Sequence, residues 1–472
     1  MSHILVASMP APGHVNPMLA IACHLRDRGH SVLFHTGDVF REQVESQGLR
    51  FIPLKGKANF DYRTFNKFLP EGKTLMPGSE DMIHSCKHVM ADTMLPQYDG
   101  IREILSREPI DVILVNFIFF GVIPLLLGPP TDRPPVVSVG VSPLALSSID
   151  ASPLRGPATT AEQRERNREE TRQFQGSLAC VNEYLDNLLN GYGCPPLPGF
   201  FLDCLYTLPD LFLQLTVDAL EFPRSDMPSH IKFVGPVMPR SSSGFQPPDW
   251  WKELDGSRPV VLVTQGTIAN ADLNDLIGPT IAALSTEDVT VIAATGKANG
   301  AINTSIPSNA KVTSFVPFME VLPKVDVFVT NGGFGAVNQA LSMGVPIVIA
   351  GETEDKAFVA ARVAWTGAGI SLGTSHPTPE EVRSAVRKIL KDDTYRAKAR
   401  VLQNNFAQYE ALDLIAGYVE ERLAQAPGIP RSSSNPPWPL DPANPIASRP
   451  TEGRYTPTSS PAQEQAPQRQ SV

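Results

Sequence analysis

Residues 327–341 read VFVTNGGFGAVNQAL. An apolar strand is expected to end at Thr330, glycines follow at positions 332, 333 and 335, and a helical pattern begins at once. Glycine allows a sharp turn and lets a ligand come close to the backbone amides. A helix start adds unpaired N–H groups and the positive end of the helix dipole, so the pattern is typical of a phosphate-binding loop. Its late position predicts that the second of two similar halves holds the phosphates.

The composition indicates a globular protein large enough for two domains. The chain has 472 residues, of which 42% are hydrophobic and 19% charged. A net charge of −9 and the lack of a basic cluster with interleaved aromatics argue against nucleic-acid binding. The longest apolar run, residues 117–127, is too short to span a bilayer. We expect a cytoplasmic protein without an integral membrane segment, and peripheral membrane contact stays open.

Alternating strands and helices predict an α/β fold with parallel sheets that are covered on both faces. Residues 236–252 are rich in proline, serine and glycine, which is typical of an interdomain linker. We therefore expect a first domain at 1–235 and a second domain at 253–426. Residues 427–472 form a proline-rich tail that cannot bury enough apolar surface to order itself, with a docking segment as the alternative. Ligands are expected in the cleft between the carboxyl ends of the two sheets.

Several motifs give the chain a family resemblance. Residues 9–17 read MPAPGHVNP, and the second half carries FVP from 315, TNGGFG from 330, GVP from 344 and EDK from 354. FVGP from 233 and QGT from 265 accompany them. In these motifs the chain resembles the UDP-glycosyltransferases, inverting enzymes of the GT-B fold that act on macrolides, sterols and other secondary metabolites. The resemblance covers about residues 1–425 and implies two Rossmann-like, doubly wound domains facing a central cleft.

His14 is the candidate catalytic base. It follows a strand and Gly13, and a helix is expected from Pro17 with Asn16 as its N-cap, so the ring should point into the cleft. A neutral imidazole can take the proton of an acceptor hydroxyl near neutral pH. The alternative is a histidine that only caps its loop.

Asn116 is the expected partner of His14, and it departs from the family pattern. The resemblance implies an aspartate at the end of this later strand. We expect the Asn116 carbonyl to accept the histidine N–H, without the negative charge that would raise the pKa of His14. Asp92 stays open as another partner, whereas Asp111 should lie too far along the strand.

The resemblance also implies how the donor half binds its ligand. Asn331 stands where a histidine is expected at the diphosphate, and Gln339 where a glutamate would hold the ribose. Asp355 matches the residue that binds sugar hydroxyls, and Lys356 replaces a glutamine, which leaves the donor sugar open. The expected donor-site residues are Gly13, Gly266, Thr267, Phe315, Val316, Asn331, Gly332, Gly333, Phe334, Gly335, Gln339, Asp355 and Lys356.

Phe315 would lie against the uracil ring, with the Val316 backbone at the base edge, while Thr267 would face the phosphates. A core aromatic and a strand cap are the alternatives for Phe315 and Thr267. A solvated acidic loop is the alternative reading of the segment around Asp355. The acceptor is expected to be shaped by residues 79–97, 117–127 and 142–148.

The leading hypothesis is inverting transfer of a hexose, glucose in the first place, from a UDP-sugar to a hydroxyl of a small lipophilic acceptor. We expect no cofactor and no metal, since the sequence has no Asp-x-Asp pair and fixed amide dipoles can stabilise the leaving diphosphate. Two alternatives remain: a nucleotide-sugar-binding protein with weak or no activity, and a GT-B epimerase that needs no acceptor. A monomer or weak dimer is expected.

Overall fold

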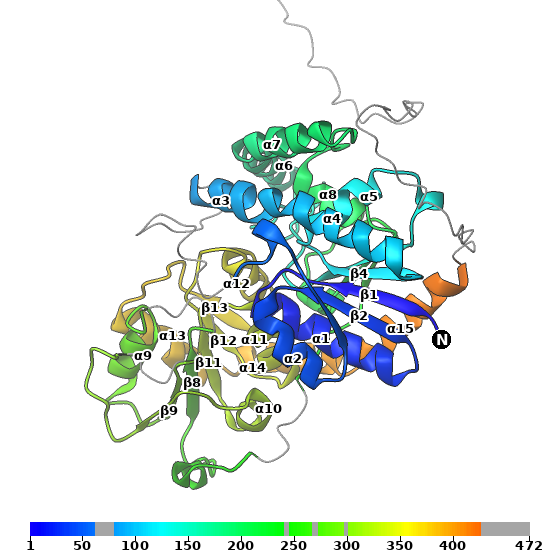
Figure 1. Cartoon of the computed structure of the whole chain (residues 1–472). Coiled ribbons are helices and arrows are strands. Elements are labelled where there is room, and N and C mark those ends of the chain that lie inside the picture. Colours follow the sequence, from blue (N-terminus) through cyan, green and yellow to red (C-terminus); the bar gives the residue numbers. More distant parts are fainter. Residues whose placement is uncertain (62–79, 240–244, 267–271, 297–300, 426–472) are drawn as a thin grey trace, which may run out of the picture.

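A computed structural model describes residues 1–61, 80–239, 245–266, 272–296 and 301–425. Within them the chain forms two α/β domains, each built on one parallel sheet (Figure 1). Four expectations lie at least partly outside these residues: residue 79 at the start of the expected acceptor region 79–97, Thr267, the middle of the linker at 240–244, and the tail at 427–472.

The first domain is built on a seven-stranded sheet in the order β3-β2-β1-β4-β5-β6-β7. Its strands are β1 (His3–Ala7), β2 (Ser31–Thr36), β3 (Arg50–Pro53), β4 (Val112–Asn116), β5 (Val136–Gly140), β6 (Leu211–Gln214) and β7 (Ile231–Phe233). The order reverses between β1 and β4, which are neighbours in parallel register. Ligands bind at such a switch point, outside the carboxyl ends of the strands.

Alternate residues of β1 supply two different hydrophobic layers. Ile4 and Val6 pack with α1 (Pro12–Asp27), whereas Leu5 and Ala7 pack with α4 (Asp92–Arg107) on the opposite face. Side chains of a strand point alternately to the two faces, so a continuous apolar run is what a doubly covered strand requires. The first sheet is therefore buried on both sides.

The second domain is built on a six-stranded sheet in the order β10-β9-β8-β11-β12-β13, again parallel throughout. Its strands are β8 (Val260–Thr264), β9 (Thr290–Ala294), β10 (Ala310–Thr313), β11 (Val327–Thr330), β12 (Ile347–Ile349) and β13 (Gly369–Ser371). The order reverses between β8 and β11. The loops after these two strands begin with Gln265 and Asn331, so the predicted phosphate loop lies at the second switch point.

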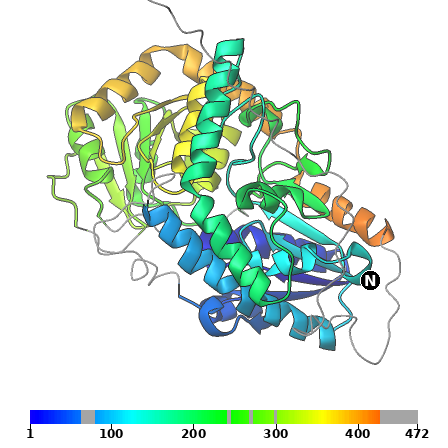
Figure 2. The ribbon, with the colours of Figure 1, turned by 90° about the horizontal axis from the view of Figure 1, so that it is seen from above.

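The remaining helices cover the sheets and the junction. They are α2 (Arg41–Ser46), α3 (Glu80–Ser85), α5 (Ile123–Leu126), α6 (Ala161–Ser177), α7 (Ala179–Gly191), α8 (Phe201–Thr207), α9 (Ile277–Leu284), α10 (Phe318–Val321), α11 (Phe334–Ser342), α12 (Lys356–Thr366), α13 (Pro379–Lys391), α14 (Asp393–Phe406) and α15 (Ala411–Gln425). A π-helical turn, Cys86–Ala91, joins α3 to α4. Figure 2 shows α6 and α7 running lengthwise across the junction of the two domains.

Helix α1 begins five residues earlier than predicted. Ala11 is its N-cap and Pro12 its first residue, so Pro17 lies inside the helix and Asn16 is not the cap. Proline suits a first helical position because no N–H is needed there. Pro17 cannot bond the carbonyl of Gly13, a loss that is tolerated where Gly13 is exposed to solvent. His14 consequently lies on the first turn of the helix and not in the loop before it.

Helix α15 returns to the first domain. The sequence division placed it with residues 253–426, but its apolar face joins the core beneath α1 through Ile415 and Val419 (Figure 1). Ion pairs fix the same contact, since Glu420 accepts from Arg28 at 2.9 Å. The last helix thus packs on the first domain, where its apolar stripe finds a partner.

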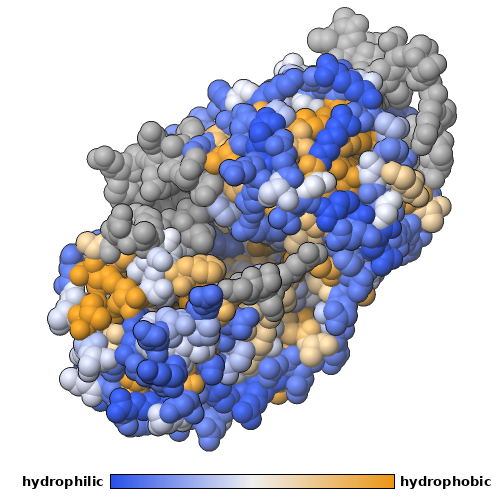
Figure 3. Space-filling model, turned by 60° about the horizontal axis from the view of Figure 1, so that its bottom comes forward, coloured by the Kyte–Doolittle hydropathy of each residue, from blue (hydrophilic) through white to orange (hydrophobic). Residues whose placement is uncertain are grey.

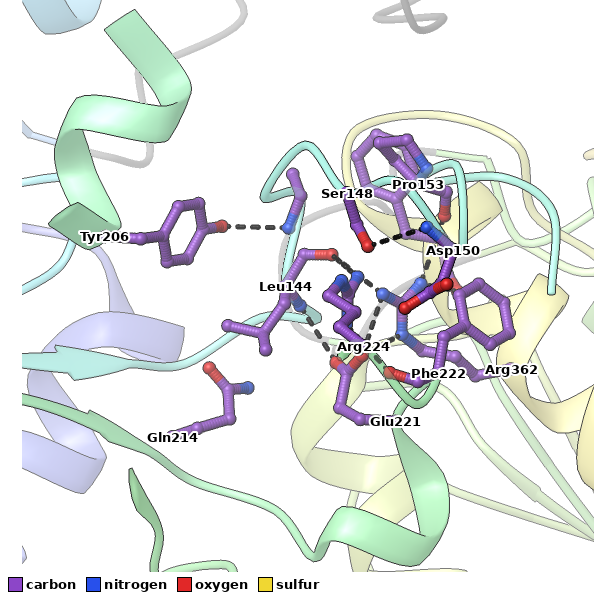
Figure 4. A network of polar contacts seen from close by, with 12 residues as sticks. Leu144, Ser148, Asp150, Pro153, Tyr206, Gln214, Glu221, Phe222, Arg224 and Arg362 are labelled. Atoms are coloured by element: carbon purple, nitrogen blue, oxygen red, sulfur yellow. Dashed lines mark hydrogen bonds and ion pairs between the residues drawn. The ribbon is translucent and has the colours of Figure 1, made fainter. Parts of the chain in front are cut away.

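A buried cluster of charges joins the two domains (Figure 4). Arg362 of α12 donates from Nε to Glu221 of the first domain at 2.9 Å and from Nη2 to the carbonyl of Leu144 at 2.8 Å. Arg224 also donates to the Leu144 carbonyl, and the Phe222 ring lies 4.5 Å from the Arg362 guanidinium. The three charged side chains are almost completely buried. We call Glu221, Arg224 and Arg362 the junction cluster.

Candidate active site

His14 and Asn116 meet at the switch point of the first sheet. Asn116 ends β4, His14 lies on the first turn of α1, and the Asn116 Nδ2 is 2.9 Å from the His14 Nδ1. Asn116 is fully buried, whereas His14 is half-buried. The structure therefore brings together the two residues that were predicted to form the catalytic pair.

The backbone of Met9 decides how Asn116 is oriented. Its N–H donates to the Asn116 Oδ1 at 2.8 Å. A backbone N–H can only donate, so the amide oxygen must face Met9 and the amide N–H₂ must face His14. The His14 Nδ1 is then the acceptor, and the proton of the neutral ring lies on Nε2. The prediction that the Asn116 carbonyl accepts from the histidine is wrong, because a backbone donor already occupies that oxygen.

The surroundings of His14 favour its neutral form. Burial lowers the pKa of His14 to about 4, and the carboxylate of Glu354 opposes this shift. Glu354 belongs to the second domain, so its charge acts across the cleft. Its backbone is in the left-handed region, at a φ of 57°, which is uncommon for a residue other than glycine. Glu354 also forms an ion pair with Lys356.

The two other candidate carboxylates are engaged elsewhere. Asp111 accepts from the backbone N–H of His3 at 2.8 Å. It precedes the first residue of β4, so it lies at the opposite end of this strand from Asn116. Asp92 accepts from the hydroxyl of Tyr184 and pairs with Lys57 and His88. Asn116 is thus the side chain that orients His14.

The glycine turn after β11 leads directly into α11. Gly332 has a φ of 94°, a conformation that favours glycine, and Gly333 is the N-cap of the helix. The first turn of α11 carries no acidic residue, and no side chain caps it. The N–H groups at Phe334 and Gly335 therefore have the arrangement of an anion site at a helix start, as the sequence predicted.

Asn331 joins the two loops of the second switch point. It is buried, and its Nδ2 donates to the carbonyl of Gln265. Gly266, at a φ of 76°, lies against the Asn331 amide. One hydrogen of the amide is therefore used inside the protein, which leaves the other for a phosphate oxygen. The sequence did not predict this hydrogen bond between the loops that follow β8 and β11.

Asp355 and Lys356 lie beside the phosphate loop. Lys356 is 4% exposed and its Nζ is 3.5 Å from the Thr353 hydroxyl, so the ammonium is held by its own loop. A side chain at position 351 would collide with the carbonyl of Asn331, which requires glycine there. Burial raises the pKa of Asp355 to about 6, while the Lys356 ammonium opposes the shift.

Phe315 has the exposure expected of a platform for a nucleobase. Its side chain is 72% exposed, although Val316 beside it is buried, so the alternative of a core aromatic is wrong. Gln339, expected at the ribose, donates from Nε2 to the carbonyl of Gly335 at 3.1 Å. That side chain is folded onto its own helix.

Aromatic side chains line the junction beside α6. Phe174 of α6 and Phe358 of α12 form an edge-to-face pair at 6.3 Å, and Phe117 stacks on Tyr206 at 6.1 Å. A cavity of about 310 Å³ lies there, lined by Ser152, Pro153, Leu154, Glu170, Gln173, Phe174, Ser177 and Phe358. Figure 3 shows that the surface is hollowed between the two domains. Residues of α6 and α12 were not among the expected acceptor regions.

Two further findings on the described residues concern metal binding and membrane spans. Their His, Cys, Asp and Glu side chains form no group of three or more that could hold a metal ion. None of their helices is both long and apolar enough to cross a membrane.

Comparison with known proteins places the chain in a family. Residues 5–95 match the glycosyltransferase family 28 N-terminal domain, and residues 279–420 match the C-terminal domain of erythromycin biosynthesis protein CIII-like proteins. The chain is 37% identical to UDP-glycosyltransferase 2 of Phaeomoniella chlamydospora over 437 residues, which cover 89% of this chain and 96% of that protein. The chain belongs to the UDP-glycosyltransferase family.

This glycosyltransferase is also 36% identical to the 4'-demethylrebeccamycin synthase of Lentzea aerocolonigenes, over 89% of this chain and all of that protein. Among solved structures, the calicheamicin glycosyltransferase CalG4 matches with a TM-score of 0.69 at 23% identity, over 90% of this chain and 100% of that one. The predicted family and the predicted GT-B fold are both confirmed.

Proposed function

We propose that this glycosyltransferase moves a glucosyl group from UDP-glucose to an oxygen of a small apolar acceptor, with inversion at the anomeric carbon. Relatives named for glucosyl transfer support this donor. UDP-glucosyltransferase A1 of Starmerella bombicola is 33% identical, over 89% of this chain and 92% of that protein. The avaP UDP-glucosyltransferase of Aspergillus versicolor is 32% identical over 90% of this chain.

One observation carries the proposal: the candidate residues His14 and Asn116 lie at the switch point of the first sheet and Asn331 at that of the second, and the carboxylate of Glu354 in the second domain raises the pKa of His14 in the first. Parallel sheets bind ligands at these points. In our assignment the start of α11 holds the diphosphate, Phe315 stacks on the uracil, and Asp355 accepts from sugar hydroxyls. His14 faces the acceptor oxygen, with Asn116 as its positioning partner.

The reaction follows from this arrangement. The acceptor hydroxyl loses its proton to solvent, its oxygen attacks the anomeric carbon from the side opposite the diphosphate, and the bond between that carbon and the phosphate oxygen breaks. The electron pair leaves with UDP. N–H groups at a helix start and the helix dipole stabilise the charge that develops on the leaving group.

Product analysis tests the proposal. Incubation with UDP-glucose and a mixture of phenols and sterols should yield UDP and a glucoside by mass spectrometry, with inverted anomeric configuration by NMR. Replacing His14 by alanine should lower the rate ~10²-fold or more, because a positioned group at the reacting oxygen is lost. His24→Ala, at the solvent-exposed end of the same helix, is the matched control.

Two outcomes would contradict the proposal. Calorimetric binding of UDP-glucose without product from any acceptor would indicate a nucleotide-sugar-binding protein. The substitutions at Asn116, Asn331, Gln339 and Lys356 make this the second candidate. Conversion of the donor sugar with no acceptor present would indicate an epimerase.

A further inference from the structure

The hydrogen bonds of Asn116 have a consequence for the acceptor. Met9 holds the amide oxygen, the amide N–H₂ donates to the His14 Nδ1, and the neutral ring therefore carries its proton on Nε2. Nε2 is the ring nitrogen on the side away from Asn116. Toward an acceptor, His14 thus presents a hydrogen-bond donor and not a base.

Reversing this tautomer is unfavourable. A proton on Nδ1 would face the amide N–H₂, so two donors would oppose each other and the buried amide would lose its acceptor. An unsatisfied buried donor costs about 1–3 kcal/mol. Burial also lowers the pKa of His14 to about 4, which disfavours the imidazolium that base catalysis forms. In a serine-protease triad, asparagine in place of the aspartate gives the wrong tautomer and lowers kcat by about 10⁴.

We propose that the acceptor of this enzyme reaches the site as an oxyanion, an acidic phenolate or a carboxylate, which the His14 Nε2–H binds and positions. This inference rests on the proposed transfer reaction. The oxyanion donates a lone pair to the anomeric carbon, the bond to the diphosphate breaks, and its electron pair leaves with UDP. No proton has to move, so no base is required.

The charges around His14 permit an anionic acceptor. The dyad of His14 and Asn116 is neutral, and the one carboxylate that acts on it, Glu354, is ion-paired with Lys356. Apolar rings at Phe117, Phe174 and Phe358 lie in the adjoining junction. A flat aromatic acid fits these surroundings better than a polar aliphatic alcohol does.

An acceptor series tests the inference. The wild-type enzyme is assayed with 4-nitrophenol, 4-methylphenol, benzyl alcohol and benzoate, which share one ring and differ in acidity. We expect kcat/KM for 4-nitrophenol to exceed that for benzyl alcohol by ~10³-fold or more. For each phenol the rate should rise with pH until the phenol itself is ionised. The benzoate arm distinguishes carboxylates from phenolates as the natural source of the oxyanion.

The Asn116→Asp variant reverses the tautomer. One carboxylate oxygen can keep the Met9 N–H bond and the other can accept from an Nδ1–H, so Nε2 becomes a base. We expect the ratio of benzyl alcohol to 4-nitrophenol turnover to rise ~10²-fold or more. Asn404→Asp, on the exposed surface of α14, adds the same charge and should leave the ratio unchanged. Circular dichroism and thermal melting report whether each variant is folded.

His14→Gln gives an independent readout. Glutamine keeps an N–H donor but cannot act as a base, so it should lower 4-nitrophenol turnover less than alanine does. Wild-type turnover of benzyl alcohol within tenfold of 4-nitrophenol would overturn the inference, as would an unchanged ratio in folded Asn116→Asp. No glycoside from any acceptor would overturn the proposed function as well, whereas glycosides from alcohols would overturn this inference alone.

Discussion

Two polar clusters lie where the domains of this glycosyltransferase meet, and they differ in charge. The junction cluster buries one carboxylate and two guanidinium groups, and backbone carbonyls accept several of the other N–H donors, whereas the Arg224 Nε has no partner among the described residues. The dyad of His14 and Asn116 is neutral, although the family resemblance implied an aspartate at position 116. In one cluster charge is buried and well paired, and in the other an amide takes the place of a charge.

The two clusters therefore have different roles. The junction cluster holds the two domains together, and the dyad of His14 and Asn116 lies at the proposed reaction site. A buried group of charges joined by hydrogen bonds fixes two elements in one arrangement, and removing one partner takes away the bonds that it made across the junction. A neutral dyad fixes the ring of His14 equally well but supplies no charge to stabilise an imidazolium. The cleft is therefore firmly assembled around a histidine that is poorly suited to take a proton.

Arg362→Met should break the junction cluster and give the largest effect. Glu221 would be left with Arg224 at 3.4 Å as its remaining charged partner. Because Arg224 still compensates the charge of Glu221, the loss is that of charge-assisted hydrogen bonds, about 1.5–3 kcal/mol in the free energy of unfolding in urea. Arg387→Met is the matched control, since Arg387 pairs with Glu287 at the surface and its loss should be far smaller. Equal losses in the two variants would contradict the role of the cluster.

Asn116→Asp should give the dyad a buried carboxylate, as Glu221 gives one to the junction cluster. A carboxylate beside the ring favours the imidazolium, so the pKa of His14 should rise from about 4 by ~1–3 pH units. An NMR titration of the ring resonances measures this shift. A pKa that stays near 4 in the folded variant would show that burial alone controls this histidine.

Phe315→Ala extends the comparison to the proposed donor site, where an exposed side chain is expected to contribute to ligand binding and not to the stability of the fold. The ring is 72% exposed, so the variant should unfold like the wild type. Stacking of a base on an aromatic ring is worth about 1–3 kcal/mol, so the Kd for UDP should rise ~5-fold to ~150-fold by calorimetry. Ile306→Ala, 48% exposed, is the control and should leave the Kd unchanged.

Asp355 should give the smallest effect, a pH dependence of donor binding. Because burial raises its pKa to about 6, the carboxylate is protonated as the pH falls from 7 to 5 and stops accepting from sugar hydroxyls. The affinity for UDP-glucose should then fall up to ~10-fold, since a group one pH unit below its pKa is about one-tenth ionised. The same slope in Asp355→Asn would rule out this carboxylate as the cause.

Much of the fold follows from local pattern. The apolar run at Val327–Thr330 and the glycines after it predicted a strand, a turn and a helix start, and all three are present. Two features did not follow. Pro17 suggested a helix start, but Pro12 offered an earlier one. Helix α15 has an apolar stripe that fits either domain, and only packing assigns it to the first.

Strand periodicity and glycine turns are local properties, so the amino-acid sequence alone specified the two parallel sheets. Its motifs specified the family, and the family resemblance implied the pairing of His14 with Asn116. The direction of the hydrogen bond between those two side chains depended on a third group, the N–H of Met9, 107 positions from Asn116. The junction cluster likewise joins Glu221 to Arg362, 141 positions apart. Such contacts exist only when distant segments pack, since a polar side chain takes the partner that burial leaves available.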